Sequence, residues 1–202
     1  MKKNRFTSIL AGSAFMLMLA GCATAPLVQY GDAGSAKPVS ADFGSSDLQQ
    51  IAGTMVDSLL TFPAVVELTA QKRPVLTVDK VKNKSMQHID TESITDTIRT
   101  KLIKSGKFQF IDRTTDTAAI DEIRIQQDSG LVDRKNAVPF GSQVGADFIL
   151  TANISEIRQK AGSITDVYYK FTMTLKNLRT GILEWSDEKE IRKVSEKPLF
   201  GG

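Results

Sequence analysis

Strict alternation of apolar and polar residues near the C-terminal end constrains this chain more than any other feature. Over residues 167–176, one side of the alternation consists of Val167, Tyr169, Phe171, Met173 and Leu175. The other side consists of Tyr168, Lys170, Thr172, Thr174 and Lys176. A period of two is that of a β-strand with one buried face, since helical geometry would scatter these residues around its axis. Residues 148–154 have the same period, so the two segments predict half-buried strands of a sheet.

The rest of the chain supplies helices and shorter strands around these two strands. Helical spacing and end signals predict helices over 47–60, 90–104 and 114–127, and a short one over 136–144 that bends near Pro139. Strands are predicted over 74–81, 108–110 and 182–191, with a hairpin turn at 179–181 and a loop over 83–87. Strand–helix alternation followed by a late antiparallel meander predicts an α/β (α+β) fold, a mixed sheet covered by helices.

The N-terminus has the three parts of a signal peptide. Residues 1–5 are basic, residues 6–20 are mostly apolar, and small residues precede Cys22. The apolar run is shorter than the roughly 20 residues that a membrane-spanning helix needs. The sequence Leu19-Ala20-Gly21-Cys22 resembles the lipobox of bacterial lipoproteins at all four positions. This resemblance implies cleavage between Gly21 and Cys22, a diacylglycerol on the Cys22 sulfur, and a further acyl chain, such as palmitate, on its amine.

Three regions follow from this assignment. Residues 1–21 are the predicted signal peptide, 22–45 a lipid-anchored tether rich in Gly, Ser and Pro, and 46–202 a globular domain. The 24 residues of the tether reach about 80 Å when fully extended, at ~3.3 Å each. Because residue 23 is Ala and not the Asp that favours inner-membrane retention in enteric lipoproteins, we expect the outer membrane, facing the periplasm. Ser46-Asp47 is the predicted N-cap of the domain, which is expected to be a monomer.

Charge content argues against a nucleic-acid partner, and cysteine content excludes an intramolecular disulfide. The chain carries 26 basic and 23 acidic residues, and removal of Lys2, Lys3 and Arg5 with the signal peptide leaves 23 of each. A neutral mature protein has no overall electrostatic footprint for nucleic acid, so no nucleic-acid partner is expected. Cys22 is the only cysteine, so the chain forms no intramolecular disulfide.

The sequence offers no recognisable catalytic machinery. His88, the only histidine, lies in a predicted loop and is interpreted as a surface residue. Asp90, Glu92 and Asp96 are interpreted as acids in the first turns of a helix, where the helix dipole favours them, and not as a metal cluster. One histidine without a free cysteine cannot supply the usual zinc ligands. We therefore predict no catalytic residue, no metal and no cofactor.

Four stretches together resemble the LpoB family, the outer-membrane lipoprotein activators of class A penicillin-binding proteins. They are residues 78–85, 105–108, 144–150 and 180–186, and they occur in the family's order across about residues 74–192. The resemblance implies a fold similar to the N-terminal domain of TolB. It also implies a non-enzymatic role in cell-wall synthesis and cell shape: the domain docks on the bifunctional peptidoglycan synthase and stimulates glycan polymerisation and cross-linking.

Two features depart from the family pattern. The enteric members have a long, Pro-rich tether, whereas this one is short, with Pro26 and Pro38. Surface residues outside the matched stretches also diverge, so the resemblance transfers no partner contact. Lys82, Asn83 and Tyr168 are our candidate contacts, because all three are expected to be exposed. An alternative function remains open, that of a structural or assembly lipoprotein in a secretion or surface-polymer system.

The lipobox generates the first testable prediction. Replacement Cys22→Ser should abolish incorporation of a fatty-acid analogue, because the serine hydroxyl does not replace the thiol that receives the diacylglycerol. Metabolic labelling of the wild-type and variant proteins measures the difference. Label that persists on the variant, or a mature N-terminus other than residue 22, would contradict the lipoprotein assignment.

Overall fold

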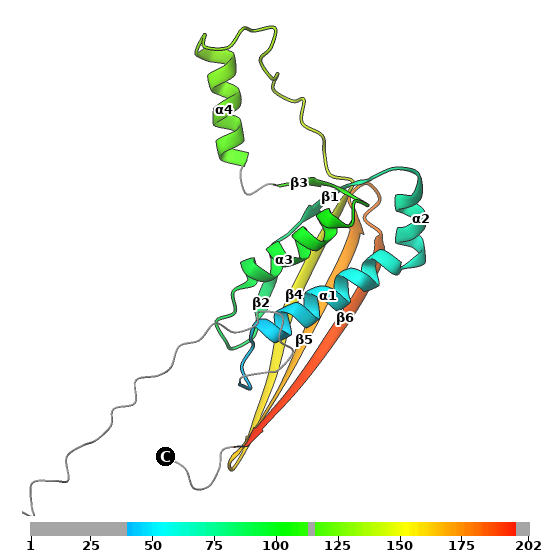
Figure 1. Cartoon of the computed structure of the whole chain (residues 1–202), viewed down its shortest axis with the longest axis vertical. Coiled ribbons are helices and arrows are strands. Elements are labelled where there is room, and N and C mark those ends of the chain that lie inside the picture. Colours follow the sequence, from blue (N-terminus) through cyan, green and yellow to red (C-terminus); the bar gives the residue numbers. More distant parts are fainter. Residues whose placement is uncertain (1–39, 113–115, 197–202) are drawn as a thin grey trace, which may run out of the picture. The chain divides into compact units, whose positions relative to one another are not determined.

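The computed structural model describes residues 40–112 and 116–196 (Figure 1). The predicted signal peptide, its cleavage after Gly21, the lipidation of Cys22 and most of the predicted tether lie outside these residues. Four helices are present in the described ranges: α1 (Ser45–Thr61), α2 (Pro63–Gln71), α3 (Thr91–Lys104) and α4 (Asp116–Asp128).

Six strands form one mixed sheet. They are β1 (Val75–Val78), β2 (Lys82–Lys84), β3 (Gln109–Ile111), β4 (Phe148–Ala161), β5 (Ile164–Asn177) and β6 (Leu183–Glu196). The order is β3-β1-β4-β5-β6, and β2 also pairs with β4. β1 is parallel to β3 and β4, and β2 is parallel to β4, whereas β4, β5 and β6 form an antiparallel meander. The predicted mixed sheet with a late meander is confirmed.

The core lies between one face of this sheet and two helices. α1 and α3 lie side by side over the long strands (Figure 1). Their apolar residues recur at helical spacing and are fully or almost fully buried: Ile51, Met55 and Leu59 on α1, and Ile94, Ile98 and Leu102 on α3. They pack against the predicted inward side of β4 and β5, and Trp185 of β6 is also buried, as predicted. Each such side chain contributes roughly 1.5–3 kcal/mol through burial.

Two helix predictions need correction. The apolar run of α1 ends before Pro63 as predicted, but Pro63 begins α2, because proline suits the first position of a helix, where no N–H partner is needed. The predicted helix over 136–144 is absent. Pro139 supplies no N–H there, Gly141 has φ of 81°, and the backbone of Val138 is hydrogen-bonded by Gln126 and Gln127 of α4 instead. No single described helix is long and apolar enough to cross a bilayer; α1 and α2 pass that test only together, across a 68° bend.

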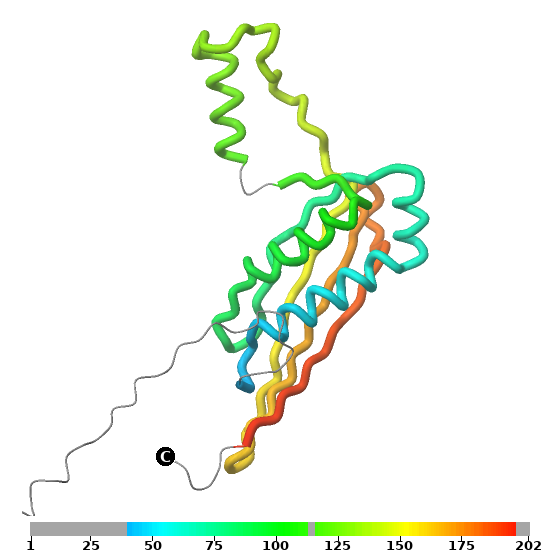
Figure 2. The backbone as a smooth tube through the Cα atoms, viewed as in Figure 1, coloured from blue at the N-terminus to red at the C-terminus, as the bar shows by residue number. Residues whose placement is uncertain are grey.

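β2 corrects the loop predicted over 83–87. Residues 82–84 pair in parallel with residues 153–155, although they contain no apolar side chain that would signal a strand. Val78 is opposite Leu150 and Lys82 is opposite Asn153, so four steps along one strand match three along the other. This extra residue is a β-bulge, and it reverses which side chains face the core. Figure 2 shows β1 and β2 following one another along β4.

Residues 40–44, which we call the strap, pack against the sheet. The Phe43 ring contacts the Tyr169 ring edge-on at 5.7 Å, Arg158 forms a 2.8 Å ion pair with Asp42, and the Tyr169 hydroxyl donates to the Ala41 carbonyl at 3.1 Å. The strap was predicted to be the end of the tether. The difference arises because β4 continues to Ala161, whereas its neighbour β2 ends opposite Ser155, and the strap covers part of the exposed inner face.

Lys193 on β6 fixes the strap to the first turn of α1. Its ammonium group donates to the carbonyls of Ser40 (3.3 Å) and Asp42 (2.7 Å) and to the carboxylate of Asp47 (2.5 Å). The same Asp47 oxygen accepts the N–H of Gly44 at 2.8 Å, and Gly44, not Ser46, is the N-cap of α1. Both charged side chains are buried, with 8% and 6% exposed. Three hydrogen bonds therefore occupy all three N–H groups of one buried lysine.

Substitution of this lysine tests its role in stability. Lys193→Met should lower the free energy of unfolding by about 3 kcal/mol, because it leaves the Asp47 carboxylate buried without its cation. Urea denaturation monitored by Trp185 fluorescence measures this loss, and Asp47→Asn in the same chain should recover part of it. Arg192→Met is the matched control, since Arg192 points to the other side of β6 and is exposed. Equal losses in the two single variants would contradict the buried-pair assignment.

Candidate partner-binding surface

The face of the meander opposite α1 and α3, which we call the open face, is polar. Its side chains on β4 and β5 are half-exposed and include Thr151, Asn153, Ser155, Tyr168, Lys170, Thr172 and Thr174. Tyr168 thus lies opposite the apolar face, as predicted. A shallow hollow of about 420 Å³ beside it is lined by Ile157, Gln159, Asp166 and Tyr168.

The charges on the open face largely satisfy one another. Lys170 pairs with Glu188 at 2.6 Å, and the Arg192 guanidinium forms a two-oxygen contact with Asp166, closest at 2.7 Å. The hydrogen bond from Arg192 lowers the pKa of Asp166. A hydrogen bond to Glu190 raises the pKa of Tyr168, because ionisation would bring two negative charges together. This part of the face therefore presents little net charge to a partner.

Lys82 and Lys84 extend the open face onto β2. They are in register with Asn153 and Ser155, so the bulge places their side chains on the same side as Tyr168. Both lysines are exposed, and within the described part of the chain neither has an ion-pair partner. The structure thus brings Lys82 and Tyr168, two of the three candidate contacts, onto one face.

Asn83, the third candidate, has a different role. Its carbonyl oxygen accepts from the N–H and the hydroxyl of Ser85, at 2.9 and 2.7 Å. Its amide nitrogen donates to the carbonyl of Gln87 at 2.8 Å. The Ser85 hydroxyl also accepts from the N–H of Gln87 at 3.2 Å. Asn83 therefore orders the turn after β2 through three hydrogen bonds, while its exposed amide has a second N–H beyond them, and its role as a partner contact stays a prediction.

Met86 lies in this turn and was not anticipated from the sequence. Its side chain is 93% exposed, and the backbone on either side of it is held by the hydrogen bonds of Asn83 and Ser85. We call residues 82–88 the Met86 loop; it also carries Lys82, Lys84 and the exposed His88, a surface loop residue as predicted. An isolated methionine in a basic, polar stretch was the available signal, but no periodicity distinguishes such a residue. A preordered loop loses little conformational entropy on binding, and a methionine adapts to an apolar pocket.

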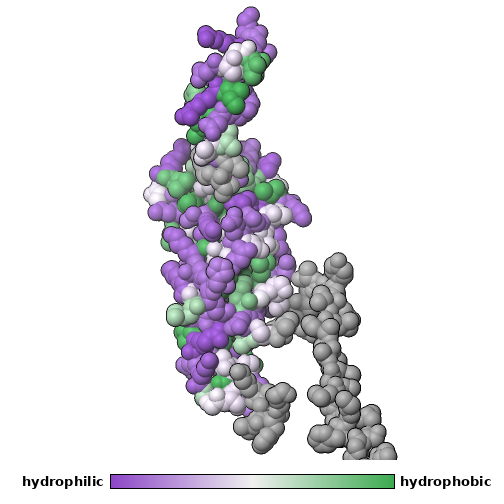
Figure 3. All heavy atoms as spheres, turned by 90° about the vertical axis from the view of Figure 1, so that its left-hand side faces the viewer, coloured by the Kyte–Doolittle hydropathy of each residue, from purple (hydrophilic) through white to green (hydrophobic). Residues whose placement is uncertain are grey.

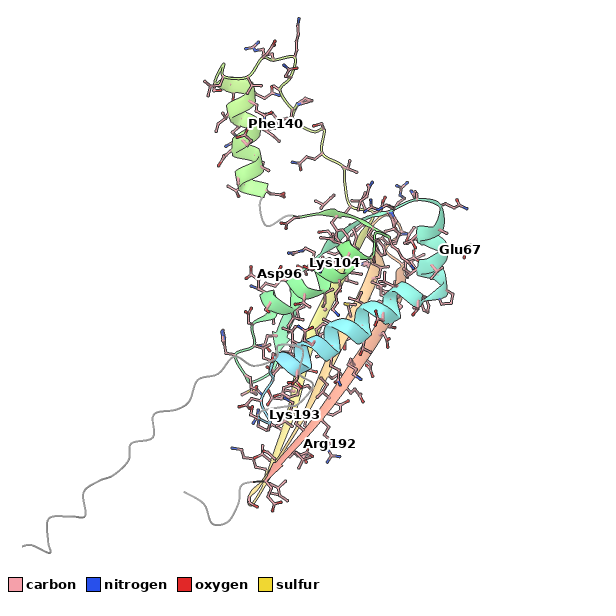
Figure 4. The ribbon with its side chains drawn as sticks, in the orientation of Figure 1. Glu67, Asp96, Lys104, Phe140, Arg192 and Lys193 are labelled. Carbon is pink, nitrogen blue, oxygen red and sulfur yellow. The ribbon has the colours of Figure 1, made fainter. Side chains whose placement is uncertain are left out.

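A cleft of about 670 Å³ at the carboxyl ends of β1 and β3 was a second candidate. Two ion pairs engage charged groups of its lining: Lys80 pairs with Glu92 at 3.4 Å, and Arg99 pairs at 2.7 Å with Asp96, the α3 residue labelled in Figure 4. Asp90 accepts the N–H groups of Glu92 and Ser93, so it caps α3 as predicted. In the described ranges, no three His, Cys, Asp or Glu side chains are placed to hold a metal ion.

The remaining surface shows no comparable feature on the side that includes α3. Figure 3 shows that this side is mostly hydrophilic, with hydrophobic side chains in small separate areas. α4 and the segment after it have no buried residue of large size, and they expose Ile120, Ile125, Leu131, Phe140 and Val144. These side chains are scattered, whereas the Met86 loop combines rigidity, exposure and charge in one place.

Comparison with known proteins relates the chain to one family. A family model described as the peptidoglycan-synthase activator LpoB matches residues 47–191. The penicillin-binding protein activator LpoB of Dickeya dadantii is 25% identical over 119 residues, which are 59% of this chain and 57% of that protein. The match therefore spans little more than half the length of this relative.

Solved structures of low identity accompany this match. The C-terminal domain of LpoB from Escherichia coli is 20% identical with a TM-score of 0.45, covering 72% of this chain and 98% of that one. The corresponding domain from Salmonella enterica is 17% identical with a TM-score of 0.43, covering 73% and 99%. Lipoprotein GNA1162 from Neisseria meningitidis is 17% identical with a TM-score of 0.39, covering 60% and 84%.

The hydrogen bonds of Asn83 generate a prediction for the free protein. Asn83→Ala should speed amide exchange at Ser85 about fivefold, the factor for a lost hydrogen bond of about 1 kcal/mol. Hydrogen exchange followed by NMR measures this rate. Lys82→Ala is the control, because the neighbouring lysine side chain makes no such bond, and it should leave the rate unchanged. Equal amide exchange rates at Ser85 in wild type and Asn83→Ala would show that the Asn83 side chain does not hold this turn.

Proposed function

The chain belongs to the LpoB family of peptidoglycan-synthase activators, and from this premise we propose that it binds a class A penicillin-binding protein and stimulates its synthesis of peptidoglycan. The family model covers residues 47–191, which include the whole Met86 loop. In this proposal the chain acts by docking on the synthase and is itself no enzyme.

The observation that carries the proposal is the exposure of Met86 on a hydrogen-bonded turn just after Lys82 and Lys84, two exposed lysines that have no ion-pair partner among the described residues. Few interface residues supply most of the binding energy, and they act best when free-state geometry already matches the bound one. Asn83 and Ser85 supply that preorganisation here. The partner surface would then have an apolar pocket for Met86 and acidic groups for Lys82 and Lys84, since opposite charge guides encounter and fixes orientation.

Anchoring would set where this interaction takes place. We propose that Cys22 carries the lipids that fix the chain in the outer membrane, with the domain in the periplasm. We propose that residues 22–39, which precede the strap, form the tether; these 18 residues would span about 60 Å at most, at ~3.3 Å each. A synthase anchored in the inner membrane must therefore extend toward the domain. Confinement near the partner raises its effective concentration, so a modest intrinsic affinity suffices.

Reconstitution with the organism's own synthases tests the proposal. The full chain is expected to bind a class A penicillin-binding protein and to raise its polymerisation rate with lipid II as substrate. Met86→Asp should weaken binding at least tenfold, because it puts a charge into an apolar pocket. Lys82→Glu with Lys84→Glu should mainly slow association, with a weaker effect at high salt.

Matched controls separate a contact effect from loss of folding. Lys104→Glu with Lys135→Glu makes the same change in net charge at two exposed lysines outside the Met86 loop, and it should leave binding intact. If wild-type chain neither binds nor stimulates any class A synthase of its organism, the activator function is refuted and an assembly role becomes the leading alternative. If the wild type binds but Met86→Asp binds equally well, the function stands and the contact site is wrong.

A further inference from the structure

We propose that the strap positions the Met86 loop, so that the place where the tether joins the domain and the loop that contacts the partner form one hydrogen-bonded unit. The functional half of this inference rests on the proposed function. The structural half rests on contacts in the free protein, and it is tested separately.

Gln87 is the residue that joins the two segments. Its side-chain oxygen Oε1 accepts the N–H of Phe43 at 3.1 Å, and its side-chain nitrogen Nε2 donates to the hydroxyl of Tyr169. That hydroxyl in turn donates to the carbonyl of Ala41 at 3.1 Å. The side chain of one loop residue is thus fixed by two separate points of the strap, directly at Phe43 and through Tyr169 at Ala41.

The same residue also holds the loop from within. The Gln87 carbonyl accepts from Asn83, and the Gln87 N–H donates to the hydroxyl of Ser85. Gln87 therefore belongs to the hydrogen-bonded turn that displays Met86 and, at the same time, to the contact with the strap. Displacement of the strap removes the Phe43 N–H from Gln87 and the Ala41 carbonyl from Tyr169, so the turn loses one of its supports.

Tyr169 transmits this contact without being able to touch a partner. Its side chain is fully buried on the core face of β5, and its ring packs edge-on against Phe43. Burial raises the pKa of Tyr169, so its hydroxyl keeps the proton that it donates to Ala41. Hydrogen bonds in such a buried chain polarise one another, which makes the loss of one member felt by the others.

The strap is held at its other side by Lys193, so it has one seated arrangement. The ammonium group binds the carbonyls of Ser40 and Asp42, one on each side of Ala41. Displacement of the chain at Ser40 would first break the hydrogen bonds from Lys193, and then the hydrogen bond between Phe43 and Gln87. The seated strap therefore adds to the order of the Met86 loop, and partner binding and strap seating favour each other by linkage.

Tyr169→Phe tests the structural half, because it deletes only the hydroxyl that joins Gln87 to Ala41. In the full chain, amide exchange at Ser85 and Gln87 should become about fivefold faster, the factor for one hydrogen bond of about 1 kcal/mol. Tyr168→Phe is the matched control, since it deletes a hydroxyl from the next residue on the opposite face of the sheet. Unchanged exchange in Tyr169→Phe, or equal acceleration in both variants, would overturn the inference.

Synthase binding tests the functional half. Tyr169→Phe should weaken binding of the class A synthase about fivefold, although the residue is buried, and bound synthase should slow exchange of the Phe43 amide. Ile98→Val, a small core deletion in α3, controls for general loss of stability and should leave affinity unchanged. If wild type binds no synthase, the proposed function fails while the exchange comparison still decides the strap–loop contact. If wild type binds and Tyr169→Phe binds equally well, the strap does not position the loop for binding.

Discussion

One face of β5 and of the first half of β4 is apolar, and the need to remove this face from water governs the rest of the structure. α1 and α3 bury their apolar rows against it, and those two helices contribute about half of the largest fully buried side chains. The strands are longer than the helices that cover them, however, so Tyr169 and its neighbours need another cover. The strap supplies it, and a segment that looks like linker in the sequence becomes part of the domain.

Holding the strap with a buried lysine costs desolvation free energy, because the ammonium group loses its hydration. The arrangement around Lys193 offsets this cost with three acceptors, one of them a carboxylate. An apolar residue in its place would deprive the carbonyls of Ser40 and Asp42 of this donor and leave the Asp47 carboxylate with only the N–H of Gly44. The lysine thus specifies one seat for the strap, and the same geometry places the backbone of Phe43 and Ala41 within reach of the Met86 loop.

The open face and the Met86 loop differ in how their charged and apolar side chains are satisfied. On the open face, ion pairs such as Lys170 with Glu188 satisfy their charges internally, which suits a surface that stays hydrated. The Met86 loop is different, since its backbone is fixed by Asn83 and Ser85 while its methionine and two lysines have no partners in the described part of the chain. This combination of an ordered backbone with exposed apolar and basic side chains suits a contact site for another protein.

Local sequence patterns were enough to predict β4, β5, β6, α1, α3 and α4, because burial of one face imposes a repeat that the sequence must carry. The same patterns, with the end signals of helices, predicted the capping of α3 by Asp90, the burial of Trp185 and the exposure of Tyr168. The packing of the strap, β2 and α2 were missed. β2 is a strand only because β4 offers it an edge, and its lysines carry no pattern. The hydrogen bonds by which Asn83 holds the turn were not foreseen either. Only the tertiary structure decided which side of the sheet Lys82 faces, through the bulge between β1 and β2. It also brought Tyr169 into contact with Gln87 and Ala41, from which it is separated by 82 and 128 residues. Such contacts leave no local trace, since a hydrogen bond between distant residues depends on where the whole chain places them and not on the residues beside them.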